Sequence, residues 1–199
     1  MLNNKSVIFL GSSVTYGNNG YSFVEMLAEK YSLTYIKEAV SGTALADTDG
    51  GSYVARLMKV PKDFKADAFV CQLSTNDAGR HMPLGVISDG FEFSDFDKGT
   101  TDGAIEYIIK YVKETWDCPV FFYTGTKFDS PHYQKMVDDL CVIAEKWGVI
   151  LIDMWNAPEM NGLSPEKVKE YMNDPVHPTT AGYREHWLPF MEKVLNENL

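Results

Sequence analysis

A serine hydroxyl, an imidazole and a carboxylate are the side chains of this sequence that are best placed to do chemistry. The segment Gly11-Ser12-Ser13 follows a short apolar run, where a strand-to-helix turn can present a hydroxyl at the mouth of a sheet. Near the other end of the chain, Asp174 and His177 each precede a proline. Because proline disfavours helical geometry in the residue before it, we expect a stiff extended loop there. An imidazole held in such a loop can act as a base, and a neighbouring carboxylate can orient it.

Two further motifs follow predicted strands and could bind a developing negative charge. Gly42 lies in Ser41-Gly42-Thr43, where glycine lets the backbone approach a ligand closely. Asn76 lies in Ser74-Thr75-Asn76-Asp77, and a side-chain amide can donate a hydrogen bond to an oxyanion. Each motif is also typical of an ordinary turn, and a Gly/Ser turn after a strand also suits phosphate binding. The first motif is neither a P-loop nor a dinucleotide fingerprint, because the required Gly and Lys spacing is missing.

The elements that must position these residues alternate between strands and helices. Short apolar runs predict strands at residues 6–10, 33–40, 66–73, 119–124 and 149–154. Apolar residues at helical spacing predict helices at residues 21–31, 52–60, 103–115, 131–147, 164–172 and 180–195. This alternation, with strands that are apolar almost throughout, predicts a parallel sheet covered on both faces, a three-layer α/β/α sandwich. Ligands bind at the carboxyl ends of parallel strands, which is where the motifs lie.

Together, the four motifs resemble the SGNH (GDSL-type) hydrolase family in order and in approximate spacing along the whole chain. The blocks that carry the resemblance are Gly11-Ser12-Ser13 for the family's Gly-Asp-Ser, Gly42 for its second-block glycine, residues 74–77 for Gly-x-Asn-Asp, and residues 174–177 for Asp-x-x-His. The resemblance implies a flavodoxin-like fold with a five-stranded parallel sheet, formed by one domain over residues 1–199.

The resemblance also implies a serine esterase or acylhydrolase that needs no metal and no cofactor. Ser13 would be the nucleophile, His177 the general base, and Asp174 the residue that orients it. The N–H groups of Ser13 and Gly42 and the side chain of Asn76 would form the oxyanion hole. The expected substrate is a small-molecule carboxylic ester with an acetyl or other small acyl group.

Two positions depart from the family pattern and leave an alternative open. Ser12 stands where the family usually has aspartate, so Ser12 itself could be the reactive hydroxyl. Ser74 stands where the family usually has glycine, and its side chain could narrow the acyl pocket. These replacements favour a second hypothesis, a module of the same fold that binds a small ligand without turning it over.

Four more residues could line the pocket, namely Ser12, Asp77, His81 and His132. His132 belongs to a second Asp-x-x-His at residues 129–132, in which Ser130 and Pro131 are typical of a helix start. A cation is disfavoured in the first turn of a helix, so His177 is the better candidate for the base. The histidines lack His-x-x-x-His spacing and no cysteine pairs occur, which argues against a catalytic metal.

Composition limits the partners. The chain has 18 basic and 28 acidic residues, and its formal net charge of -10 disfavours nucleic acid and stable binding to an anionic membrane. No apolar window is long enough for a signal peptide or a membrane span, so we expect a cytoplasmic protein. Cys71, Cys118 and Cys141 are expected to be small core residues. Aromatic residues at positions 80–97 could shape a pocket, pack on the core or form a homo-oligomer contact.

Overall fold

Five parallel strands form one sheet in the order β2-β1-β3-β4-β5 in the computed structural model, which describes residues 1–199. The strands are β1 (Ser6–Gly11), β2 (Thr34–Ala39), β3 (Ala68–Gln72), β4 (Val120–Tyr123) and β5 (Ile150–Ile152). Four of them lie within a run that the apolar pattern predicts, and β1 extends one residue beyond its run, to Gly11. This strand order is that of a flavodoxin-like sheet, so the expected α/β fold is confirmed.

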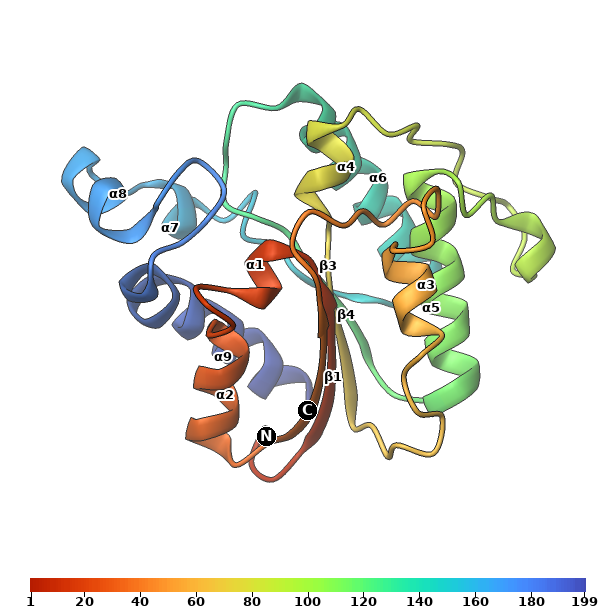
Figure 1. The fold of residues 1–199 in the computed structure, drawn as a ribbon, viewed down its shortest axis with the longest axis horizontal. Helices are drawn as coiled ribbons and strands as arrows, with labels where there is room; N and C mark the ends of the chain where they lie inside the picture. The colour runs from red at the N-terminus through yellow and green to blue at the C-terminus, as the bar shows by residue number, and fades with distance from the viewer.

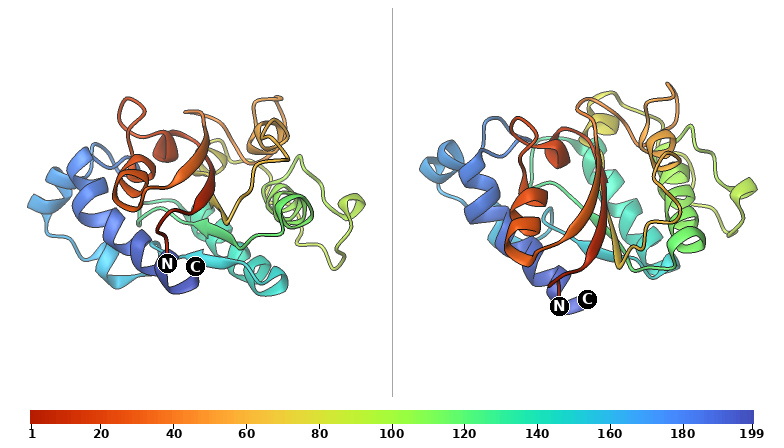
Figure 2. Two further views of the ribbon diagram at one scale, coloured as in Figure 1. Left: turned by 90° about the horizontal axis from the view of Figure 1, so that it is seen from below. Right: turned by 60° about the horizontal axis from the view of Figure 1, so that its bottom comes forward.

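Helices cover both faces of the sheet, as Figures 1 and 2 show. The longer helices are α2 (Phe23–Tyr31), α5 (Thr101–Trp116), α6 (Pro131–Trp147), α8 (Pro165–Tyr171) and α9 (Leu188–Asn198). The shorter ones are α1 (Ser13–Tyr16), α3 (Tyr53–Leu57), α4 (Thr75–Gly79), α7 (Pro158–Asn161), the 3-10 turn η1 (Phe93–Asp95) and the π-helical turn η2 (Gly182–Trp187). Helices α2 and α9 lie on one face, and α3, α5 and α6 lie on the other.

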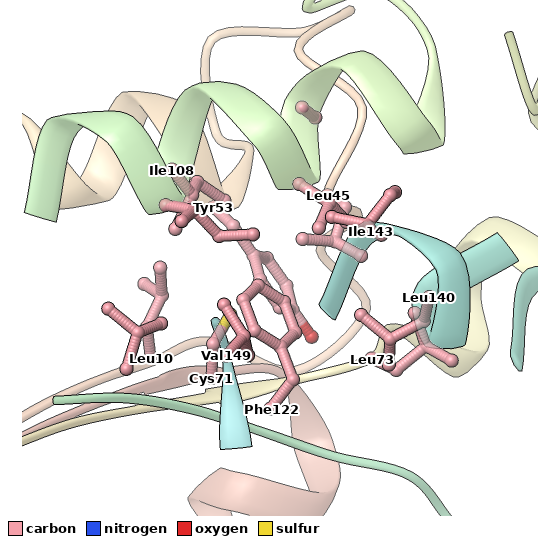
Figure 3. Packing of buried hydrophobic residues seen from close by; sticks show 14 of the residues in the cluster. Leu10, Leu45, Tyr53, Cys71, Leu73, Ile108, Phe122, Leu140, Ile143 and Val149 are labelled. Carbon is pink, nitrogen blue, oxygen red and sulfur yellow. The ribbon is translucent and has the colours of Figure 1, made fainter. Parts of the chain in front are cut away.

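Alternate residues of the strands supply two hydrophobic clusters, one on each face of the sheet. Ile8 and Phe122 pack beneath α3, α5 and α6, whereas Phe9 and Phe121 pack against α2, η2 and α9. Figure 3 shows the first cluster, in which Tyr53 and Ile108 lie over Cys71 and other strand residues. The alternation follows from the two-residue period of a strand, and it makes the central strands apolar on both sides.

Strand β2 differs from the expectation that the strands are apolar almost throughout. It lies at the edge of the sheet, and none of its six residues is fully buried. Its sequence, TYIKEA, mixes polar and apolar residues because one side of an edge strand faces solvent. Cys141 is a second correction, since it is exposed on α6 while Cys71 and Cys118 are buried as expected.

Helix starts follow the sequence signals closely. Ser130 caps α6 by accepting the Tyr133 N–H at 3.1 Å, and Pro131 occupies the first turn as predicted. The helix expected at residues 180–195 is instead two elements, because it begins as the π-helical turn η2 and continues as α9. None of the helices is both long and apolar enough to cross a lipid bilayer.

The turns that follow β1, β2 and β3 meet at one end of the sheet. Helices α1 and α4 lie at this end, while the two chain termini lie together at the opposite end (Figure 1). The carboxyl ends of β1 and β3 are adjacent, because β1 pairs with both β2 and β3. The chain leaves these strands in opposite directions along the sheet, which opens a crevice for a site.

Candidate active site

Ser13 and His177 are in direct contact although 164 positions separate them in the sequence. Ser13 is the first residue of α1, immediately after the turn that ends β1. Its Oγ lies 2.7 Å from Nε2 of His177. The backbone N–H of Ser13 has no partner within the helix, because the first N–H groups of any helix lack an acceptor there.

Asp174 orients the imidazole from the other side. Its two carboxylate oxygens lie 3.0 and 2.8 Å from Nδ1 of His177. Since an ionised carboxylate can only accept hydrogen bonds, the ring must donate from Nδ1. Nε2 is therefore left to accept the proton of the Ser13 hydroxyl. This arrangement makes the hydroxyl, the imidazole and the carboxylate one continuous hydrogen-bonded chain.

The loop that carries Asp174 and His177 is held in place by its own backbone. Oδ1 of Asp174 accepts the N–H groups of Val176 and His177, each at 2.8 Å, and the Asn173 N–H donates to the His177 carbonyl. Partial desolvation raises the pKa of Asp174, but these N–H groups and the His177 ring outweigh it. The resulting pKa lies below the ordinary value, so the carboxylate stays ionised.

Two other loops bring hydrogen-bond donors to the same rim. Gly42 adopts a left-handed backbone conformation with φ of 79°, and its N–H donates to no backbone carbonyl. Asn76 is the second residue of α4, and its amide donates to the Thr43 carbonyl at 3.0 Å. An amide carries two N–H bonds, so the second can point to a ligand. The contact to Thr43 ties α4 to the loop that carries Gly42.

The floor under Ser13 is a buried polar network. The side-chain oxygen of Gln72 accepts the Ser12 N–H and the Thr15 hydroxyl, both at 2.9 Å. Ser12 itself is fully buried, with its hydroxyl 3.3 Å from the same oxygen. Gly11 is required here, because a Cβ at this position would lie 1.7 Å from Oγ1 of Thr15. Of the two serines in the turn, only Ser13 reaches the rim.

The comparisons with known proteins agree with this geometry. The sequence pattern of the GDSL-like lipase/acylhydrolase family matches residues 9–185. The chain belongs to this family. No curated protein matches the chain in sequence.

Solved structures share the fold along almost the whole chain. A protein from Lactobacillus plantarum superposes with a TM-score of 0.79 at 20% identity, covering 99% of each chain. A protein described as a GDSL-like lipase from Bacteroides ovatus gives 0.71 at 13% identity, covering 98% of this chain and all of the other. An acetyl xylan esterase gives 0.70 at 16% identity, covering 96% and 99%. At such identities the likeness concerns the fold.

The two departures from the GDSL-type pattern have structural explanations. Ser12, in the position of the usual aspartate, is fully buried, and its hydroxyl points into the floor network. Ser74, in the position of the usual glycine, is fully buried and caps α4 by accepting the N–H groups of Asn76 and Asp77. Its side chain therefore faces the helix, so it does not narrow a pocket at the rim.

Asp77 also lies beneath the site instead of in a pocket. Its carboxylate is fully buried and accepts the N–H groups of Leu45 and Ala46 at 2.7 and 3.1 Å. The Thr101 hydroxyl donates to it as well, at 3.2 Å. Asp77 thus joins α4, the loop after Gly42 and the start of α5.

Surface depressions lie on both sides of the loop formed by residues 174–177. One, of about 730 Å³, lies between α4 and the start of α6 and reaches the loop at Val176. The other, of about 470 Å³, lies against α7 and α8 and reaches the loop at Asp174. His81 and His132 both line the first depression, with ring centroids 5.5 Å apart. The first depression also includes Thr75, the neighbour of Asn76, so it adjoins the donor loops.

Sequence reasoning missed three polar residues that shape this rim. They are Arg56, which is buried below the loop after β2, Gln72 in the floor, and Arg80, which donates to the Gly42 carbonyl at 2.6 Å. A polar residue inside an otherwise apolar segment was the available signal for Arg56 and Gln72. No group of three or more His, Cys, Asp or Glu side chains could hold a metal ion.

Proposed function

We propose that this protein is a serine ester hydrolase that removes a small acyl group from an alcohol. The observation that carries the proposal is the continuous contact from Ser13 Oγ through His177 to Asp174. A hydroxyl next to an imidazole base that a carboxylate orients is the arrangement that nucleophilic acyl transfer needs.

The chemistry follows from these positions. Ser13 Oγ attacks the ester carbonyl carbon, and its proton passes to Nε2 of His177. The tetrahedral oxyanion is bound by the N–H groups of Ser13 and Gly42 and by the Asn76 amide. The intermediate expels the alcohol, which takes the proton from His177. Water then attacks the acyl-enzyme with His177 again as base, and the carboxylic acid leaves.

The shape of the rim supports a small acyl group on a larger alcohol. The side chains of His177 and Asp174 remain 39% and 49% exposed, so the proposed catalytic groups are open to solvent. A long acyl chain would need an enclosed apolar channel, whereas the depression beside Thr75 and Val176 mixes polar and apolar side chains. The alcohol part of the ester would occupy this depression, next to His81 and His132.

Hydrolysis of p-nitrophenyl acetate by the wild type and by Ser13→Ala tests the proposal. We expect Ser13→Ala to lose at least about 1000-fold in kcat, because only the oxyanion hole and substrate binding remain. Ser12→Ala is the matched control and should retain most of the activity, since the Ser12 hydroxyl is buried. A fluorophosphonate probe should label the wild type and not Ser13→Ala. Equal turnover by the two proteins would reject Ser13 as nucleophile, and a folded wild type without turnover or labelling would favour a ligand-binding module.

A further inference from the structure

Arg56 is a buried cation without an anion. It lies on α3, and only 4% of the residue is exposed. It has no ion-pair partner, and all four of its hydrogen bonds go to uncharged oxygen atoms. Because burying an unpaired charge is costly, hydrophobic residues of similar volume would stabilise a fold at least as well. The groups that accept hydrogen bonds from the guanidinium therefore indicate a role beyond stability.

The guanidinium connects the segments that end β1 and β2. Nη2 donates to the Gly11 carbonyl at 2.8 Å and to the Thr43 hydroxyl at 2.9 Å. Nη1 donates to the Glu38 carbonyl at 2.5 Å, near the end of β2. Gly11 lies two residues before Ser13, and Thr43 directly follows Gly42. One rigid group thus joins the backbone of the nucleophile turn to the loop that supplies the second oxyanion donor.

The same loop is held from its other side by α4. Asn76 donates to the Thr43 carbonyl, and the Asp77 carboxylate accepts the N–H groups of Leu45 and Ala46. Residues 41–46 are therefore held between a buried cation on α3 and a buried carboxylate on α4. This double attachment, together with the Arg80 donation to the Gly42 carbonyl at 2.6 Å, holds Gly42 in its left-handed conformation although the residue is exposed.

We propose that Arg56 is a positioning residue that fixes the Gly42 N–H relative to Ser13 in ester hydrolysis. The inference rests on the proposed function, and it assigns Arg56 no contact with the substrate. Arginine suits the task because its planar fork reaches two acceptors at once, whereas lysine offers a single point charge. Preorganised donors act only if they already lie where the oxyanion forms, so a shifted loop slows the chemical step and leaves ground-state binding intact.

Steady-state kinetics with p-nitrophenyl acetate on Arg56→Met and Arg56→Lys test the proposal, each measured per active site titrated with a fluorophosphonate. We expect Arg56→Met to lose about 100-fold in kcat with KM within about twofold of the wild type. Arg56→Lys should recover part of the loss. Inhibition by a boronic acid, which forms a tetrahedral adduct on Ser13, should weaken in parallel with kcat. Arg184→Met, which removes an exposed arginine, is the control and should match the wild type.

Thermal melting establishes that each variant is folded. A folded Arg56→Met with kcat within about threefold of the wild type would overturn the inference, while Ser13-dependent turnover would leave the proposed function standing. If Arg56→Met does not fold, Thr43→Val decides, because it removes one acceptor of the guanidinium, along with the hydroxyl's own donation to the Val40 carbonyl, and leaves the cation in place. We expect Thr43→Val to lose about tenfold in kcat at unchanged KM. Unchanged kcat in this variant would equally overturn the inference.

Discussion

Asp174 performs two structural tasks with one carboxylate. Oδ1 accepts two backbone N–H groups of its own loop, while both oxygens contact the His177 ring. The loop is therefore shaped by the same group that selects the tautomer of the imidazole. The low pKa of Asp174 follows from these donors, which all favour the ionised form.

The substitution Asp174→Asn should separate these two tasks. Asparagine keeps one oxygen for the backbone N–H groups, so the loop should persist and the melting temperature should change little. Its amide would donate to the ring and favour the wrong tautomer, which should lower kcat by about 1000- to 10,000-fold. Turnover of p-nitrophenyl acetate measures the effect, and the exposed Asp138→Asn serves as control. A loss of less than tenfold would mean that the carboxylate does not orient the base.

At the level of single residues, motif order was enough to bring the main candidates together. Ser13, Asp174 and His177 lie in hydrogen-bonding contact, and Gly42 and Asn76 lie on loops joined through Thr43. The burial of Ser12 could not be predicted, because it depends on Gln72 of another strand. The role of a buried polar residue beneath the site depends on partners that are distant in sequence. A local sequence pattern does not reveal these partners.

Among the elements, the turn between β1 and α1 is tightly constrained. The chain must pass so close to the Thr15 side chain that only glycine fits at position 11. The close approach lets Gln72 and Tyr123 reach Thr15, whose Oγ1 lies 2.9 and 2.6 Å from their oxygen atoms. Packing beneath Ser13 thus depends on the absence of a side chain at position 11.

Gly11→Ala should therefore destabilise the protein and reduce its activity together. The added methyl group would force Thr15 to move, at a cost of about 1–3 kcal/mol in unfolding free energy. Gly79→Ala is the matched control, because its Cβ would meet no atom within 4 Å and its φ is not positive. Alanine in this helix should be neutral or stabilising by up to about 1 kcal/mol. Urea unfolding measures the stability of both variants. Equal stability of Gly11→Ala and Gly79→Ala would contradict the close approach of position 11 to Thr15.

The predicted elements were correct where the apolar period spans several turns or a whole strand. Helices α2, α5 and α6 and all five strands lie where the pattern indicates. The four-residue helices α1 and α7 and the five-residue α4 were missed, because a segment so short cannot display a helical period. The edge position of β2 followed only from the flavodoxin-like resemblance and not from the segment's own pattern, since strand order is a property of the whole sheet.

Over the whole molecule, Asp102 is an acidic side chain whose burial makes stability fall as pH rises. Asp102 on α5 is 2% exposed, and its Oδ1 has no hydrogen-bond partner. Burial, with a smaller contribution from the charge of Asp139, raises the pKa of Asp102 to about 7. The folded protein therefore binds this proton between about pH 4 and 7, where the unfolded chain releases it. Through this window the contribution of Asp102 to stability falls as pH rises.

Asp102→Asn should remove this penalty. We expect the variant to exceed the wild type in unfolding free energy by about 2–4 kcal/mol at pH 8 and to equal it near pH 4. Urea unfolding at the two pH values measures the difference. The exposed Asp138→Asn should show no such pH-dependent gain. A gain that is the same at both pH values would show that burial does not hold the Asp102 proton.

The global topology followed from alternation and handedness more than from any single segment. Alternating strands and helices implied a parallel sheet with helices on both faces, and right-handed crossovers left few arrangements open. The pairing of β1 with β3 as well as β2, which opens a crevice at the carboxyl ends of these strands, was implied by the flavodoxin-like resemblance and not by the alternation itself. It depends on which faces of the sheet the connecting helices cover.

The exposure of Cys141 has a practical consequence. Cys71 and Cys118 are shielded within the fold, so the folded chain offers a single thiol to reagents. A maleimide dye would attach to α6 alone and report on this protein without engineering. The same thiol could link two molecules through a disulfide when air oxidises a concentrated sample. Any dimer observed during purification should therefore be compared with and without a reducing agent before it is regarded as an assembly held by packed surfaces.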